Sequence, residues 1–467
     1  MLLQNWKTSV TVFVCSFSAF PVWADRIELS TAKDVGEEIG IALNAGVQAR
    51  LLWDDQEPDT VDFYGGVLSL PVKGCSLVLE TDQTLTFLYC PENRLTRLDV
   101  VQAPRLETII CSDNELKELH LDRASRLVEL NCQRNELQQL SVYKCQDLEY
   151  LNCAQNPLEY LDLSVLPALK SLVASETLLE TVDSRKMVRL EKLWCQDSRI
   201  RTLDLSRNAA LREVLAYGNE IETLDVHAAT GLTELWASDN RIRVLDLADC
   251  KQIRNLNADH NELDDLTLSP SISSFVESIY IQDNRLFYHK FPSSNLKKAE
   301  LQYTPQRPYV LNREVSVDIP LSLKDYLFRN AWRDRLDCQI VWKTGSDGKE
   351  LTEGQVSEGK DYAYTFHEPV GWVYAEVTSA LYPDAVLRLD SIHVTDPSSV
   401  ASVPGSEVRL SALPGMILVE TDVEQTVRIF AADGSCLMNR RVTPGSYQYP
   451  CLPGVYVVNG KKISVRK

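Results

Sequence analysis

The sequence predicts a mainly β protein built around a solenoid, a stack of short coils. Three observations lead to this prediction. One 21-residue pattern, L-x-x-L-x-C/A-x-x-N-x-L-x-x-L-x-L, recurs nine times without interruption, and a tenth copy follows two residues late. Apolar positions inside the pattern lie two residues apart, as on one side of a strand. A unit this short cannot bury its own apolar edge, so neighbouring units must stack.

Residues 1–24 have the composition of an export signal. Lys7 supplies the positive start, Val10–Phe20 is apolar, and Val22-Trp23-Ala24 offers a small-residue cleavage site before Asp25. The apolar stretch falls short of the roughly 20 residues that a membrane-spanning helix needs. We expect the signal to be removed, and we expect no membrane-spanning segment elsewhere in the chain.

Residues 25–84 are predicted to form an N-terminal cap that covers the open end of the solenoid. Their apolar spacing suggests one short helix over Ala32–Ala45, followed by extended segments at Gly66–Val72 and Leu77–Leu79.

Residues 85–305 are predicted to be the solenoid, with about ten repeats. Positions 4 and 6 of each repeat should point inward from a parallel sheet, and positions 3, 5 and 7 outward. Position 6 accepts either Cys or Ala, so it requires a small apolar group, and its cysteines are expected to be free thiols in the core. These cysteines are Cys90, Cys111, Cys132, Cys153 and Cys195. Near the C-terminus, Cys436 and Cys451 form the best candidate pair for a disulfide.

Two polar positions of the repeat are predicted to be structural. Position 9 is usually Asn, whose side chain can both donate to and accept from backbone groups where each strand ends. The Asp of the recurring Leu-Asp-Leu segment is expected to form a turn on a solvated surface and not to bind a metal. Too few residues follow for a useful α-helix, so the convex side should be extended or turn-like.

After the solenoid, apolar residues alternate with a period of two, as at Val315, Val317 and Ile319. Residues 306–396 are therefore predicted to be an immunoglobulin-like β-sandwich. The Pro- and Ser-rich residues 397–406 are predicted to be a linker, and residues 407–467 a small C-terminal β domain.

The outward positions of the solenoid supply the candidate binding site, on the concave face of the sheet. Large aromatic groups held in water there suggest a partner surface. We expect an aromatic centre with an acidic rim, suited to a basic protein segment. The candidate residues are Tyr150, Trp194, Asp197, Glu213, Tyr217, Glu234, Trp236 and Asp239. The same aromatic groups could stack on sugar rings, so glycan binding remains an alternative.

The net charge of the chain and its sequence motifs restrict the classes of function that the protein can have. The formal net charge of −18 disfavours nucleic acid as a partner. The six histidines lie in different repeats and domains without metal-ligand spacing, and catalytic motifs are missing. His260 is interpreted as a solvated rim residue. The sequence thus favours a binding protein without a cofactor over an enzyme, with an enzyme accessory or inhibitor as a weaker alternative.

The repeat resembles that of the secreted leucine-rich repeat proteins of Bacteroidota, often labelled internalin-J-like. The segment Val427–Gly434, the segment Pro453–Val458 and the basic end Lys461–Lys467 resemble the sorting domain read by the type IX secretion system. The resemblance implies export across the outer membrane of a Gram-negative bacterium, loss of the C-terminal domain and attachment to the cell surface. It also implies a role in adhesion to host proteins, cell–cell contact, biofilm formation or virulence.

Overall fold

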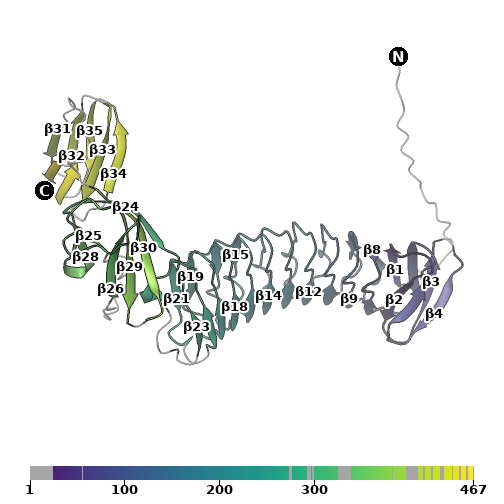
Figure 1. Cartoon of the computed structure of the whole chain (residues 1–467). Helices are drawn as coiled ribbons and strands as arrows, with labels where there is room; N and C mark the ends of the chain where they lie inside the picture. Colours follow the sequence, from purple (N-terminus) through teal and green to yellow (C-terminus); the bar gives the residue numbers. More distant parts are fainter. Residues whose placement is uncertain are drawn as a thin grey trace, which may run out of the picture. The chain divides into compact units, whose positions relative to one another are not determined.

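The computed structural model consists of strands and short connections (Figure 1). It describes residues 25–54, 56–272, 276–291, 296, 299–323, 338–380, 382–395, 409–413, 416–421, 424–431, 436–443, 445–451, 454–458 and 461–465. The predicted signal at 1–24 and the predicted linker at 397–406 lie outside these ranges. The chain divides into two units, residues 1–219 and 220–467. Over the described ranges, no helix is long and apolar enough to cross a membrane.

The first unit begins with β1 (Asp25–Thr31), β2 (Glu38–Leu43), β3 (Val47–Trp53), β4 (Asp59–Phe63), β5 (Leu68–Pro71) and β6 (Ser76–Thr81). Four of these strands join β8 (Leu95–Gln102) and β10 (Glu118–His120) in a sheet of order β10-β8-β1-β6-β3-β4. The remaining two continue the solenoid sheet, because β2 pairs antiparallel with both β5 and β7 (Phe87–Tyr89).

The helix predicted over Ala32–Ala45 is wrong. Residues 38–43 form strand β2, and turns and bends connect it to β1. Ile39, Ile41 and Leu43 are buried along this strand with a period of two. Because β2 has strand partners on both sides, its backbone groups are satisfied by the ladder, and this outweighs a local helical preference.

The coils of the first unit place one three-residue strand from each repeat in a parallel sheet. After β7 these strands are β9 (Thr108–Ile110), β11 (Glu129–Asn131), β12 (Tyr150–Asn152), β13 (Ser171–Val173), β14 (Lys192–Trp194) and β16 (Glu213–Leu215). Equivalent repeat positions pair in register, so Leu151 lies between Leu130 and Leu172. The solenoid predicted from the repeat is confirmed.

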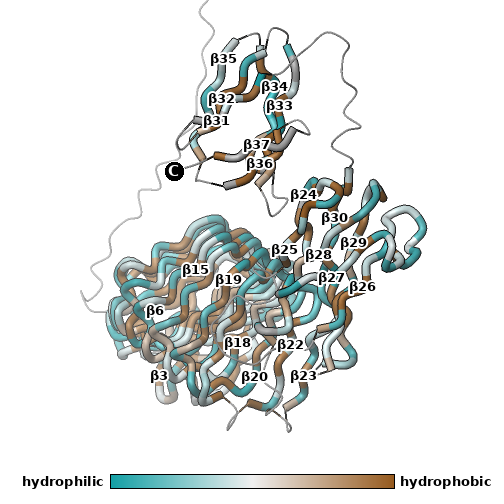
Figure 2. Tube along the Cα trace, turned by 90° about the vertical axis from the view of Figure 1, so that its left-hand side faces the viewer, coloured by the Kyte–Doolittle hydropathy of each residue, from teal (hydrophilic) through white to brown (hydrophobic). Residues whose placement is uncertain are grey.

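The second unit continues the pattern. Its parallel strands are β18 (Glu234–Trp236), β20 (Asn255–Asn257), β22 (Ser278–Tyr280) and β23 (Glu300–Gln302). On the convex side the first unit has β15 (Thr202–Asp204), and the second has β17 (Thr223–Asp225), β19 (Val244–Leu247) and β21 (Asp265–Leu268). Hydrophobic residues recur at matching places in successive coils (Figure 2).

Free thiols fill the core, as predicted. Cys90, Cys111, Cys132, Cys153 and Cys195 are buried, and none is in a disulfide. Burial raises the pKa of the Cys153 thiol from 9.0 to about 12, so the group stays neutral. The candidate bridge near the C-terminus is not formed, because Cys451 is also free.

The Asn at position 9 satisfies backbone groups between coils, which confirms its structural role. Asn156 is 2% exposed. Its Nδ2 donates to the carbonyl oxygens of Cys132 and Cys153 at 2.9 and 3.1 Å, and its Oδ1 accepts from the amide of Leu137 at 3.0 Å. The predicted turn role of the convex Asp is also confirmed, since Asp162 accepts the amide of Ser164 at 3.0 Å.

Residues after the coils form further sheets. The strands are β24 (Tyr309–Ser316), β25 (Leu321–Ser322), β26 (Cys338–Thr344), β27 (Val356–Glu358), β28 (Ala363–Phe366), β29 (Gly371–Ser379) and β30 (Val386–Thr395), with short 3-10 turns at Tyr288–Lys290 and Lys360–Tyr362. They make two sheets, β24-β30-β29-β26 and β25-β28-β27. Trp342 of the first sheet contacts Tyr364 and Phe366 of the second, with ring centroids 5.4 and 5.0 Å apart.

The C-terminal strands are β31 (Arg409–Leu413), β32 (Met416–Thr421), β33 (Gln425–Ala431), β34 (Cys436–Val442), β35 (Gly445–Pro450), β36 (Gly454–Val458) and β37 (Lys461–Val465). They form sheets of order β31-β32-β35 and β34-β33-β36-β37. Buried residues of both sheets share one apolar core that includes Ile417, Val419, Val427 and Val458.

Candidate functional site

The outward positions of the coils hold the predicted site residues, divided between the two units. The first unit carries Tyr150 on β12, Trp194 on β14 and Glu213 on β16, with Asp197 and Tyr217 just after these last two strands. The second carries Glu234 and Trp236 on β18, with Asp239 after it. Tyr150 is 45% exposed, and the two tryptophans and Tyr217 are half-buried.

Trp194 is held in place by a charged pair. Its indole Nε1 donates to Glu213 Oε1 at 2.8 Å, and Lys192 Nζ lies 4.4 Å from the centre of its ring. Lys192 Nζ also lies 3.2 Å from Glu213 Oε2, which closes the group into a triangle. A side chain fixed in this way loses little conformational entropy when a partner binds. The first unit therefore offers a preorganised aromatic group on its sheet.

Tyr217 and Asp197 are coupled at the edge of the same sheet. The amide of Asp197 donates to the carbonyl oxygen of Tyr217 at 2.9 Å. Burial, and then the negative charge of Asp197, raise the pKa of the Tyr217 phenol above its ordinary value. The phenol therefore remains a neutral hydrogen-bonding group beside a carboxylate.

The second unit repeats the arrangement of an indole beside a carboxylate, with looser geometry. Trp236 Nε1 donates to Glu234 Oε2 at 3.3 Å, and Asn255 Nδ2 donates to Glu234 Oε1 at 3.1 Å. Ser278 Oγ in turn donates to Asn255 Oδ1 at 2.6 Å. Glu213 and Glu234 were expected to form part of an acidic rim. In the structure, each of them accepts a hydrogen bond from an indole and orients it.

A row of left-handed residues was not anticipated from the sequence. Position 8 of every repeat has a positive φ between 49° and 65°. The row consists of Glu92, Asp113, Arg134, Gln155, Glu176, Asp197, Gly218, Asp239, His260 and Asp283. Gly218 carries the strongest sequence signal for this conformation, since residues with a side chain adopt it at a cost, although Asp and His adopt it more often than most.

Side chains of this row contact one another across coils in the first unit. Arg134 Nη1 lies 3.2 Å from Asp113 Oδ1, and Arg134 Nε donates to Gln155 Oε1 at 2.6 Å. Gln155 Nε2 donates to Glu176 at 3.0 Å. One positive group thus lies between negative groups along this part of the row.

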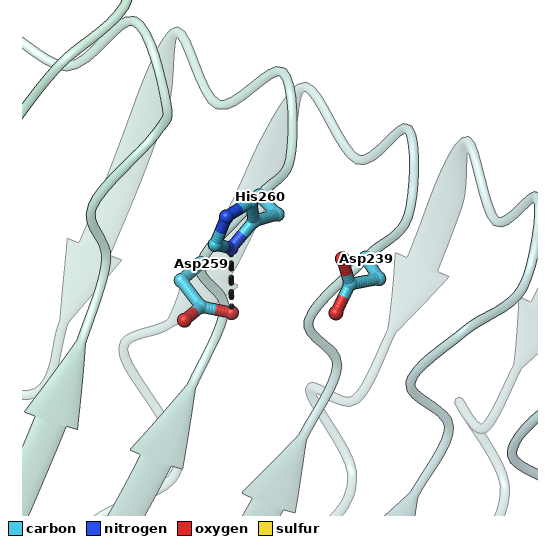
Figure 3. Close-up of side chains that lie close together, drawn as sticks. All are labelled: Asp239, Asp259 and His260. Carbon is cyan, nitrogen blue, oxygen red and sulfur yellow. Dashed lines mark ion pairs between the residues drawn. The ribbon is translucent and has the colours of Figure 1, made fainter.

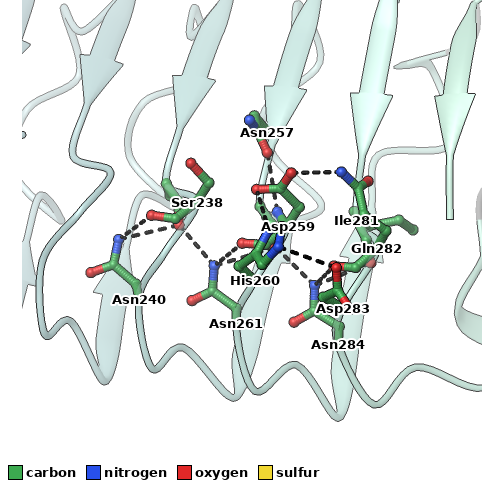
Figure 4. Close-up of polar contacts among 12 residues, drawn as sticks. Ser238, Asn240, Asn257, Asp259, His260, Asn261, Ile281, Gln282, Asp283 and Asn284 are labelled. Carbon is green, nitrogen blue, oxygen red and sulfur yellow. Dashed lines mark hydrogen bonds and ion pairs between the residues drawn. The ribbon is translucent and has the colours of Figure 1, made fainter. Parts of the chain in front are cut away.

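In the second unit the row passes through a cluster around His260 (Figure 4). His260 Nδ1 lies 3.4 Å from Asp259 Oδ1, and its Nε2 lies 3.2 Å from Asp283 Oδ2. Burial raises the pKa of Asp259, and its side chain is only 14% exposed. The His260 side chain is 48% exposed, as expected for a rim residue, but sequence reasoning did not anticipate three nearby carboxylates.

No protein-family model and no curated protein matches the chain. Its structural neighbours are leucine-rich repeat proteins, including internalin-like ones. The functional domain of InlJ from Listeria monocytogenes, described as including a cysteine ladder, matches with a TM-score of 0.41 and 18% identity over 67% of this chain and 92% of that chain.

Two further neighbours cover less of the chain. YopM, a leucine-rich effector protein from Yersinia pestis, matches with a TM-score of 0.38 and 23% identity over 44% of this chain and 56% of that chain. The internalin InlF from Listeria monocytogenes matches with a TM-score of 0.38 and 18% identity, over 44% and 62%. Repeat and coil geometry define this chain as a mainly β leucine-rich repeat solenoid, and these distant likenesses carry no function to it.

Proposed function

We propose that this protein is a secreted, surface-attached adhesin that binds a protein on a host cell or a neighbouring bacterium through the concave face of its solenoid sheet. The observation that carries the proposal is the triangle of Lys192, Trp194 and Glu213. It holds a large aromatic group half-exposed at a position where the repeat requires no aromatic residue. The fold needs no such group, which favours a role in binding.

The neighbouring residues extend this surface in the first unit. Tyr150, two strands away in the order β12-β13-β14, adds an exposed phenol, and Tyr217 adds a second beside Asp197. Trp and Tyr are enriched among residues that dominate binding energy, typically by roughly 2 kcal/mol or more each. A basic segment would suit the carboxylates beside these rings. In the second unit, Trp236 with Glu234 and Asp239 is proposed as a separate contact surface on the sheet of that unit.

Adhesion measurements with paired variants test this proposal. Beads coated with the full chain are assayed on extracellular-matrix proteins, on neighbouring bacteria and on a glycan array. We expect Tyr150→Ala with Trp194→Ala to abolish adhesion with little change in the thermal midpoint. The matched control is Tyr143→Ala with Tyr160→Ala, since these tyrosines are 58% and 71% exposed but lie outside the sheet strands.

Each outcome has a defined meaning. Adhesion of the Tyr150/Trp194 variant at the wild-type level would move the site away from the concave face. Selective binding to glycans would replace the protein partner by a carbohydrate that stacks on the same rings. Because exposed charges are screened beyond about 8 Å at physiological ionic strength, a basic partner should also bind less well as salt rises.

We also propose that residues 407–467 direct export through the type IX system, followed by attachment to the cell surface. The antiparallel hairpin of β36 and β37, which begins its second strand with Lys461 and Lys462, supports this proposal. Residues 432–434, 453 and 466–467 of the resembling segments lie outside the described residues. Deletion of Lys461–Lys467 should trap the protein in the periplasm of its host, and normal surface display of the shortened chain would reject the assignment.

A further inference from the structure

Three potential metal-binding side chains meet at the rim of the second unit (Figure 3). Asp239 and His260 occupy position 8 of successive repeats, and Asp259 occupies position 7 beside His260. Each side chain offers one ligand atom, and the three atoms lie within 4.8 Å of one another. The left-handed backbone at Asp239 and His260, with φ of 52° and 49°, is the same in both coils.

The two nitrogens of the His260 imidazole face different carboxylates. Nε2 lies 3.2 Å from the carboxylate of Asp283, whereas Nδ1 lies 3.4 Å from Asp259. Histidines that bind metals usually donate their other ring N–H to a carboxylate, which fixes the tautomer. Asp283 can accept that N–H, and the lone pair of Nδ1 then faces Asp259. Gln282 Nε2 donates to Asp259 Oδ2 at 2.6 Å and orients this second ligand.

The charge around His260 differs from the rest of the row. In the first unit Arg134 compensates Asp113 at 3.2 Å. Around His260 stand the carboxylates of Asp239, Asp259 and Asp283, and within the described part of the chain no Lys or Arg forms an ion pair with any of them. Among the described residues, negative charge therefore gathers around one imidazole with no arginine or lysine paired to it.

We propose that Asp239, Asp259 and His260 bind a divalent transition-metal ion, with Zn²⁺ as the best match. Imidazole nitrogen and carboxylate oxygen together suit Zn²⁺, whereas Mg²⁺ and Ca²⁺ prefer all-oxygen sites. Three protein ligands leave a position open in a tetrahedral site. Because Asp239 and His260 are exposed, water or a carboxylate of a binding partner can fill that position. The site lies outside the Lys192–Trp194–Glu213 triangle and does not depend on the proposed adhesin function.

The repeat itself supplies variants that remove a ligand without straining the backbone. Glycine already occupies position 8 at Gly218, so His260→Gly and Asp239→Gly suit the left-handed conformation. Gln155→Gly makes the same change at position 8 of a repeat that lies five repeats earlier in the sequence. His227→Ala removes another exposed histidine, which pairs with Asp225 at 2.6 Å.

Calorimetric titration of the chelator-treated full chain with ZnCl₂ tests the proposal. We expect one saturable site that His260→Gly, Asp239→Gly and Asp259→Asn each weaken at least tenfold, while Gln155→Gly and His227→Ala bind as the wild type does. Excess Ca²⁺ should not compete. The proposal is overturned if the wild type takes up no Zn²⁺, or if the His260→Gly variant, folded by circular dichroism, keeps the same affinity. Adhesion of these variants is scored separately, so either proposal can fail alone.

Discussion

The inner and outer sides of each coil use the same three-residue strand in opposite ways. In β14, Leu193 is fully buried, and the residues on either side of it, Lys192 and Trp194, face outward and are half-exposed. The inward strand positions 4 and 6 hold Leu, Ile, Val, Cys or Ala in every repeat, because neighbouring coils must stack. Outward positions change from coil to coil. Stability is therefore carried by a repeated set of residues, and recognition by a set that is free to vary.

The largest expected effect is the loss of folding stability when the pH is raised into the range where the buried thiols titrate. Burial raises the pKa of Cys90, Cys153 and Cys195 from 9.0 to about 12 in the folded chain. The folded state therefore holds these protons more tightly than the unfolded state. The stabilisation is complete below pH 9 and is lost as the pH rises towards 12, by about 1.4 kcal/mol per pH unit for each thiol. Thermal midpoints measured across this range should fall steeply.

A variant with Ala at the position-6 cysteines provides the control for the thiol experiment. It should fold at neutral pH, because Ala occupies the same position in other coils, for example at Ala174 and Ala216. Its midpoint should fall much less between pH 9 and 12. Equal alkaline sensitivity of both proteins would contradict a core of neutral thiols.

The next largest effect is the difference in destabilisation between alanine variants of two asparagines in one coil. Asn156→Ala should destabilise the fold by about 3 kcal/mol or more, because several buried backbone groups lose their partner at roughly 1–3 kcal/mol each. Asn152, on the outward side, donates a hydrogen bond from Nδ2 to Gln133 Oε1 and accepts one at Oδ1 from the amide of Ala154. Asn152→Ala should cost under about 1 kcal/mol, since water can replace those partners. Similar urea midpoints for both variants would remove the distinction between the two sides.

The smallest effect concerns the row of residues with positive φ at position 8, between the inward and outward sides of each coil. Gly218→Ala should cost about 1–2 kcal/mol, because φ is +65° there. An added Cβ would also lie 2.4 Å from Asp197 Oδ1. Gln155→Ala at the same repeat position should change stability by under about 0.5 kcal/mol, since Gln155 already has a side chain in that conformation. Chemical denaturation measures both, and a neutral Gly218→Ala would show that the row carries no strain.

The inner side of the coils could be predicted from the sequence because its chemistry repeats every 21 residues. The exchange of Cys111 for Ala174 identified a small apolar site, and Asn135 and Asn156 identified the polar ladder. The alternation of Ile39, Ile41 and Leu43 did signal a strand, but that strand depends on pairing with residues 68–71 and 87–89. Partners so distant cannot be inferred from local spacing.

The outer side could be predicted only as a set of positions. The sequence placed Trp194 and Glu213 on one face, yet the hydrogen bond between them depends on side-chain orientation. The row at position 8 was hidden because Asp, Glu, Arg, Gln and His occupy it, and none of these residues requires a positive φ. The cluster around His260 follows from that row, since the shared backbone conformation brings Asp239 and Asp283 towards it.

At the N-terminal end of the coil stack, the last strands oppose the addition of further copies. A parallel solenoid that ended on a parallel strand would expose a template for a second molecule to continue the sheet. Here β2 runs antiparallel to β7, and beyond it β5 is four residues long and ends in Pro71, which has no N–H to donate. An incoming coil therefore meets a short edge strand that lacks one N–H donor, which makes it a poor template for further pairing. An end of this kind favours separate molecules over growth into a fibre.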